Sequence, residues 1–116
     1  MGMIVFGIKN CDTVKKALRW LDAHDAAYRF HDFRKDGLQR QNLENWLQSV
    51  DWEILLNKRS TTWRKLDDPR KSQLDKSTAV DLMLENPTLI QRPVVCDETG
   101  CHVGFNEQEY QNRYGH

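Results

Sequence analysis

The sequence predicts an α/β protein with a mixed four-stranded sheet and a helical insertion at about residues 35–89. Short β-branched and aromatic runs alternate with segments that carry apolar residues at helical spacing, which is typical of α/β folds. A helix joins the first two predicted strands, so they are expected to be parallel, whereas a short turn joins the last two into an antiparallel hairpin. The 116 residues are expected to form a single domain, residues 1–116.

The first part of the chain is predicted to form a strand, a helix and a second strand. Residues 3–8 are β-branched and aromatic and end in the turn-prone KNCD, which indicates a buried strand. Apolar residues then recur at i, i+3, i+4 and i+7, which predicts an amphipathic helix capped by Asp12 or Thr13. The alternation in AAYRFHDF indicates a second strand that is half buried.

The rest of the chain is predicted to contain the inserted helices and the closing β-β-α segment. Helices are expected over residues 38–50, in DDPRKSQL and in STAVDLMLEN, the last of which is ended by Asn86-Pro87. WEILLNKRS is expected to be a short apolar helix that runs into a polar loop. NKRSTTWRK is expected to be a solvated loop. LIQRPVVC and CHVGF are predicted strands around the turn DETG, and NEQEYQNRY is a closing helix. This order is that of the thioredoxin fold with extra helices.

The charge and the apolar content of the sequence argue against nucleic-acid and membrane partners. The formal net charge is +0, from 17 basic and 17 acidic residues, so direct nucleic-acid binding is not expected. No apolar run approaches the length of a transmembrane helix, and the N-terminus lacks the pattern of a secretory signal. A cytoplasmic monomer without membrane contacts is therefore expected.

The chain contains three cysteines and no CxxC motif, so a dithiol motif and a zinc-ribbon half-site are both absent from the sequence. Cys96, Cys101 and His102 do not have the spacing of a standard zinc finger, and no metal site is expected. Cys101 could face Cys96 across the predicted hairpin, where a cross-strand disulfide is conceivable. In a cytoplasmic protein two free thiols are the expected state.

Cys11 stands where the first strand ends and the first helix begins. Unpaired amides and the positive end of the helix dipole favour a thiolate at such a position, and Lys9, Lys15 and Lys16 add cations. A thiolate is the form that attacks disulfides and oxyanions. A partly buried cysteine without chemistry is the alternative, and this stretch alone leaves both interpretations open.

The segments FGIKNCDTVKKALRWL, FHDFRKDGL, LLNKRSTTWRKL, PTLIQRPVV and VGFNE together resemble the arsenate reductase-related (ArsC) family, which includes the Spx regulators, and most of all its YffB-type subgroup. The resemblance implies a thioredoxin-like fold with a helical insertion and Cys11 as the nucleophile. It also implies a cis-proline at Pro93, facing the thiol. The expected substrate-binding residues are Lys9, Asn10, Asp12, Thr13, Lys15, Arg59, Arg92 and Pro93.

The sequence departs from the arsenate reductases of this family at several functional positions. Gly7 replaces a histidine four residues before the cysteine, and Val14 replaces a serine three residues after it. Of three arginines that bind the oxyanion, Arg92 is kept, whereas Asn57 and Phe105 occupy the other two places. Because an arsenate-sized anion needs several charge-assisted donors, arsenate reduction is not expected.

The remaining features predict a glutathione-dependent thiol/disulfide reductase that uses the single thiolate of Cys11. Glutathione is expected as a co-substrate, and no bound cofactor is expected. The second cysteine of the Spx CxxC switch would fall on Val14, so that switch is absent. The alternative is a non-catalytic, Spx-like regulator that binds a larger protein partner, as the Spx regulators bind RNA polymerase.

Overall fold

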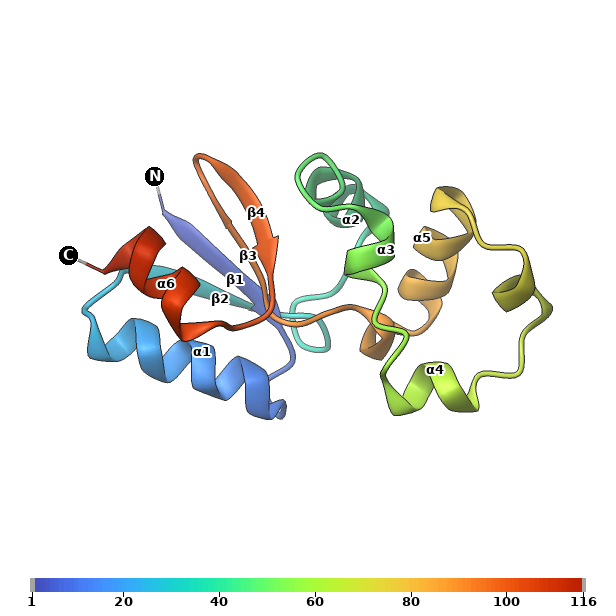
Figure 1. The fold of residues 1–116 in the computed structure, drawn as a ribbon, viewed down its shortest axis with the longest axis horizontal. Coiled ribbons are helices and arrows are strands. Elements are labelled where there is room, and N and C mark those ends of the chain that lie inside the picture. Colours follow the sequence, from blue (N-terminus) through green and yellow to red (C-terminus); the bar gives the residue numbers. More distant parts are fainter. Residues whose placement is uncertain (1, 116) are drawn as a thin grey trace. The chain divides into compact units, whose positions relative to one another are not determined.

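A computed structural model of the chain describes residues 2–115, which divide into two compact units. The sheet unit comprises residues 2–37 and 92–115, and the helical unit comprises residues 38–91. The helical unit corresponds to the insertion that the sequence predicts at about residues 35–89. Figure 1 shows the elements of both units.

The sheet unit contains a mixed four-stranded sheet in the order β2-β1-β3-β4. The strands are β1 (Met3–Gly7), β2 (Tyr28–Asp32), β3 (Val94–Asp97) and β4 (Gly100–Val103). β1 is parallel to β2 and antiparallel to β3, and β3 forms an antiparallel hairpin with β4. The predicted parallel pair and the predicted hairpin are therefore confirmed, and the fold is thioredoxin-like.

The helices α1 (Asp12–Ala23) and α6 (Glu107–Tyr114) cover one face of this sheet (Figure 1). Val5 and Val95 are directly opposite in β1 and β3, and both are fully buried on that face. They pack with Ala17, Trp20, Leu21 and Tyr110. Each large apolar side chain buried in this way contributes about 1.5–3 kcal/mol, so this cluster holds both helices on the sheet.

The helical unit contains six short helices, four of which begin at an N-cap side chain that accepts an amide hydrogen bond. The six helices are α2 (Arg40–Trp46), α3 (Trp52–Leu55), α4 (Thr61–Lys65), η1 (Pro69–Ser72), α5 (Lys76–Glu85) and η2 (Pro87–Leu89). Asp51, Ser60, Asp68 and Asp75 each accept an amide hydrogen bond at a helix start. The apolar positions of these helices form a core that includes Leu43, Trp46, Leu55, Leu82, Met83 and Leu89.

Two expectations for the helical unit are wrong. The segment NKRSTTWRK is not a loop throughout, because Ser60 caps Trp63 N–H at 3.1 Å and starts α4. The predicted helix at residues 38–50 is shorter, since α2 ends at Trp46 and turns lead on to Ser49. Among the described residues no helix is long and apolar enough to cross a membrane, and no cluster of three or more potential ligands is placed to hold a metal ion.

Candidate active site

Cys11 is the N-cap residue of α1. Its backbone is extended, with φ −135° and ψ 124°, and its carbonyl accepts the N–H of Lys15 at 2.9 Å. The helix begins at Asp12, one residue earlier than predicted, so neither Asp12 nor Thr13 is the cap. An N-cap side chain is placed to accept the unpaired amides of the first helical turn. The thiol of Cys11 therefore stands where these amides can stabilise a negative charge.

The surroundings of Cys11 lower the pKa of its thiol. Partial burial acts in the opposite direction and raises the pKa, but the N–H of Val14, the guanidinium of Arg92 and the N–H of Thr13 together outweigh it. Arg92 acts both through a hydrogen bond and through its charge. Because Cys11 is still partly exposed, its thiolate is both stabilised and reachable.

Arg92 also has donors that are not used. Its Nε and Nη1 atoms are buried and have no hydrogen-bond partner among the described residues. Unpaired buried donors carry a desolvation penalty that an anionic oxygen would remove. Arg92 therefore combines a positive charge beside the thiol with two donor nitrogen atoms that are free to bind a ligand.

Pro93 follows Arg92 directly and leads into β3. The Arg92-Pro93 peptide bond is cis, as the family resemblance implied. The Pro93 carbonyl accepts the N–H of Gly104 at 2.8 Å. This bond connects the start of β3 to the residue that follows β4, so the backbone beside Arg92 is fixed to the hairpin.

The lysines are not the principal cations of the site. Lys9 and Lys15 are exposed, and the cation that lowers the pKa of Cys11 is Arg92. Asn10 and Asp12 are both exposed, Asn10 in the loop before the cysteine and Asp12 in the first turn of α1.

Arg59 belongs to the helical unit, where it is exposed. Its backbone N–H donates to Asn57 Oδ1 at 3.0 Å. The structure therefore brings Cys11, Thr13, Arg92 and Pro93 together within the sheet unit and assigns Arg59 to the other unit.

Asp32 is a residue of the site that the sequence analysis did not single out. Its carboxylate accepts the N–H groups of Arg34, at 2.8 Å, and of Lys35 and Lys9. Burial raises the pKa of this carboxyl, but these amides outweigh burial and lower it. Asp32 thus holds the loop that carries Cys11. The sequence feature that could have identified Asp32 is its position at the carboxyl end of a strand parallel to β1. The carboxyl ends of parallel strands meet at one edge of the sheet, so Asp32 is expected near the loop that follows β1.

Gly7 and Val14, two departures from the arsenate reductases, are in contact with each other. A Cβ atom at position 7 would lie 2.8 Å from Val14 Cγ2, closer than such atoms are found. Val14 is fully buried and has no room to move. The two departures are therefore one packing feature, because a side chain at position 7 requires a smaller residue at position 14.

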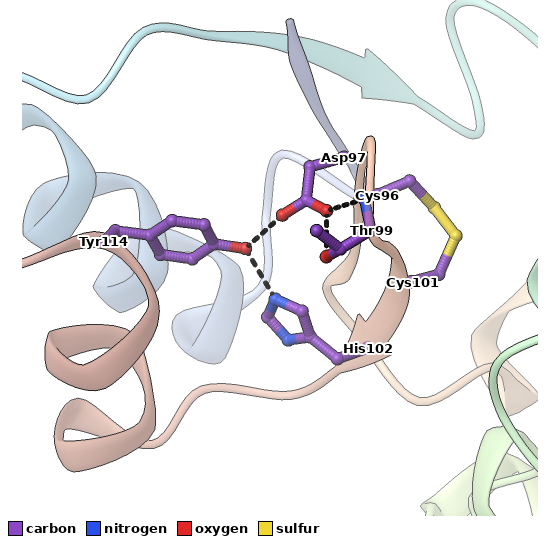
Figure 2. Close-up of a disulfide and its surroundings, with 6 residues drawn as sticks. All are labelled: Cys96, Asp97, Thr99, Cys101, His102 and Tyr114. Carbon is purple, nitrogen blue, oxygen red and sulfur yellow. Dashed lines mark hydrogen bonds between the residues drawn. A yellow bond between two sulfur atoms is a disulfide. The ribbon is translucent and has the colours of Figure 1, made fainter.

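Cys96 and Cys101 form a disulfide, with an S–S distance of 2.13 Å (Figure 2). The expectation of two free thiols is wrong. The β3–β4 register places the two cysteines directly opposite each other, with Cα atoms 4.1 Å apart, so their sulfur atoms meet across the hairpin. Cys11 is the free cysteine of the chain.

The fold and the site define a thioredoxin-like protein with one free, activated cysteine at the start of its first helix. The model of the ArsC family matches residues 6–113, and the chain belongs to that family. It is 52% identical over 107 residues to an uncharacterized protein of Haemophilus influenzae, which covers 92% of this chain and 94% of the relative. It is 31% identical over 102 residues to the global transcriptional regulator Spx of Streptococcus mutans, covering 86% of this chain and 74% of Spx.

Solved structures agree with this assignment. A YFFB protein matches with a TM-score of 0.92 and 42% identity, covering 97% of this chain and 98% of that protein. An ArsC-related protein of Brucella melitensis matches with a TM-score of 0.78 and 43% identity, covering 97% and 93% of the two chains. The predicted resemblance to the YffB-type subgroup is confirmed.

Proposed function

We propose that this protein is a glutathione-dependent thiol/disulfide oxidoreductase in which the Cys11 thiolate is the nucleophile. The observation that carries this proposal is the partly exposed Cys11 thiol, whose pKa is lowered by helix amides and by Arg92. Membership of the ArsC family supports it, because a solved relative with this fold is described as related to an arsenate reductase, which is an oxidoreductase.

The proposed reaction has two exchange steps. The Cys11 thiolate attacks a sulfur of a disulfide that contains glutathione, a Cys11–glutathione disulfide forms, and the other thiol leaves. A second glutathione thiolate then attacks the glutathione sulfur of that adduct, which releases oxidised glutathione and restores the Cys11 thiolate. The net reaction converts the substrate disulfide and one glutathione into the free substrate thiol and oxidised glutathione, so the second glutathione is the reductant. The thiol that leaves and the second glutathione exchange their protons with water.

The second step depends on glutathione because the chain offers no resolving cysteine. Cys96 and Cys101 are bonded to each other. Their disulfide also lies near the start of β1, where Cys96 pairs with Ile4, whereas Cys11 follows the end of that strand. The unpaired Nε and Nη1 of Arg92 suit an anionic group held beside the thiol, and glutathione carries two carboxylates.

The adduct itself is the test. After incubation with oxidised glutathione, intact mass measurement and peptide mapping are expected to show one glutathione on Cys11. Arg92→Gln is expected to slow adduct formation several-fold, whereas Arg19→Gln, which removes an exposed charge further along α1, is the matched control and is expected to react like the wild type. An adduct found only on Cys96 or Cys101, or none at all, would exclude the proposed chemistry.

Arsenate reduction is not part of this proposal. Asn57 occupies one of the positions where the arsenate reductases have an oxyanion-binding arginine, and its Oδ1 accepts the backbone N–H of Arg59. Phe105 stands in another and packs against Tyr110, with ring centroids 4.8 Å apart. Neither supplies a cation, so we expect negligible glutathione- or glutaredoxin-coupled reduction of arsenate. Clear turnover in that assay would show that other cations bind the anion.

A protein-binding regulator is the second candidate, and the 31% identity to Spx is the observation that favours it. In that case binding to purified bacterial RNA polymerase should be stoichiometric and equally strong for wild type and Cys11→Ser. A Cys11–glutathione adduct that turns over with a second glutathione, together with no polymerase binding, would favour the oxidoreductase.

A further inference from the structure

The Cys96–Cys101 disulfide and Cys11 lie at opposite ends of β1, and the disulfide is on the face of the sheet opposite α1 and α6. Cys96 pairs with Ile4 near the start of β1, whereas Cys11 follows the end of that strand. From Ile4 to Gly7 the strand covers about 10 Å. Cys96 also alternates with Val95, which faces α1 and α6, so the disulfide lies on the opposite face of the sheet. Direct exchange between this disulfide and Cys11 of the same molecule is therefore excluded.

The hairpin does not depend on this disulfide for its fold. Val94 and Val95 of β3 pair with Val103 and His102 of β4. In the turn, Asp97 Oδ1 accepts the backbone N–H of Thr99 at 2.8 Å and its hydroxyl at 2.6 Å. The stabilisation that a cross-link provides grows with the loop it closes, and here the sequence separation is only 5. The hairpin is thus expected to persist when the bond is broken, although Asp97 and His102 then lose the covalent link between their two strands.

The disulfide is also accessible. Cys96 and Cys101 are both partly exposed, so a small thiol can reach a sulfur atom without unfolding the hairpin. A bond that is reachable and not required for the fold has the properties of an exchangeable disulfide rather than of a structural one.

The residues next to the two cysteines contact α6 on the other face (Figure 2). The Tyr114 hydroxyl donates to Asp97 Oδ2 at 3.3 Å, and the same oxygen lies 2.8 Å from His102 Nε2. Because the hydroxyl proton goes to Asp97, His102 Nε2–H donates to Tyr114. His102 Nδ1 then carries a lone pair; within residues 2–115 it has no hydrogen-bond partner, and it lies 3.8 Å from Glu109 Oε1. Asp97 and His102 therefore hold the last residue of α6 from both strands that the disulfide links.

We propose that Cys96–Cys101 is a second thiol–disulfide centre, independent of Cys11, which exchanges with small thiols and whose redox state sets how firmly α6 is held on the sheet. The thiolate of a reductant attacks one of the two sulfurs, a mixed disulfide forms, and the other cysteine leaves as a thiolate. A second thiol of the reductant displaces the first cysteine. The reductant is oxidised to its disulfide, and the protein gains two electrons and two protons.

The first test counts thiols in Cys11→Ser, where only the pair can react. After equilibration in native buffer with a range of reduced and oxidised glutathione, maleimide labelling is expected to add no label in the oxidised limit and two in the reduced limit. The ratio of reduced to oxidised glutathione at which half of the Cys96–Cys101 pair is reduced should agree within twofold between this variant and the wild type. A pair that resists dithiothreitol in native buffer, thiols that persist in excess oxidised glutathione, or a tenfold difference in this ratio would overturn the proposal.

The second test measures α6. Amide hydrogen exchange of Glu107–Tyr114 is expected to be several-fold faster in reduced wild type than in oxidised wild type. Tyr114→Phe removes both contacts, so its two redox states should exchange at the same rate. Tyr28→Phe, which removes a hydroxyl bonded to Asp22 elsewhere in the sheet unit, is the matched control and should keep the difference. Equal exchange in the two states of the wild type would refute the coupling to α6.

Discussion

The contact between Gly7 and Val14 gives a quantitative prediction. In Gly7→Ala the new Cβ would meet Val14 Cγ2 at 2.8 Å and Cγ1 at 3.5 Å, and Val14 is fully buried. Overpacking of a core by one such group costs about 1–3 kcal/mol, so the free energy of unfolding should fall by about that amount. Val14→Ala alone removes two buried methyl groups and should cost about 1.5–3 kcal/mol.

The double variant separates this contact from other effects. In the Val14→Ala background both Cγ atoms are gone, so adding Gly7→Ala should cost less than about 0.5 kcal/mol, which gives a coupling energy of about 0.5–3 kcal/mol. The assay is urea unfolding followed by the fluorescence of Trp20, which lies in the same unit, with the helical-unit tryptophans Trp46, Trp52 and Trp63 replaced by phenylalanine in every variant. If Gly7→Ala is neutral in the parent, or equally costly in both backgrounds, the packing argument is incorrect.

Two further predictions concern titrating groups. Arg92→Gln should raise the pKa of Cys11, because it removes both a hydrogen bond and a charge. The rate of Cys11 alkylation, measured as a function of pH, reports this pKa. An unchanged pH profile would show that Arg92 does not stabilise the thiolate. Burial, followed by the charge of Arg113, lowers the pKa of His102 below its usual 6.5. The unfolded chain therefore binds this proton first, and stability should decline as pH falls from 6.5 towards the folded pKa. Urea midpoints between pH 7.5 and 5 test this, and an equally steep decline in His102→Gln would show that another group is responsible.

Much of the fold could be predicted from the sequence because the signals are local. The period-2 and 3.6-period patterns gave the strands and α1, and connection length alone decided parallel against antiparallel pairing. The error at α4 has a local cause as well. Its five residues are polar apart from Trp63, so the helix has no apolar period, and its start depends on the cap at Ser60.

The site was harder to predict because its contacts join distant segments. Cys11 was identifiable from its place at a strand–helix junction, whereas Arg92 was expected at the site from the family resemblance and not from the local sequence. The sequence shows Lys9 and Lys15 as near neighbours, whereas the fold brings Arg92 to the thiol from the start of β3. Asp32 was missed for the same reason, since its bond to the N–H of Lys9 exists only once β1 and β2 are paired.

The departures from the arsenate reductases affect anion binding and thiol activation differently. Every group that lowers the pKa of Cys11 belongs to residues 13, 14 and 92, and two of the three are backbone amides that any side chain would leave in place. Neither Asn57 nor Phe105 is among these groups. They remove guanidinium groups and leave the nucleophile unchanged, with Arg92 still offering two unpaired donors beside it. A site of this kind has lost the multiple donors that a small, highly charged oxyanion requires, and it has kept what thiol–disulfide exchange requires, which is a stabilised and reachable thiolate.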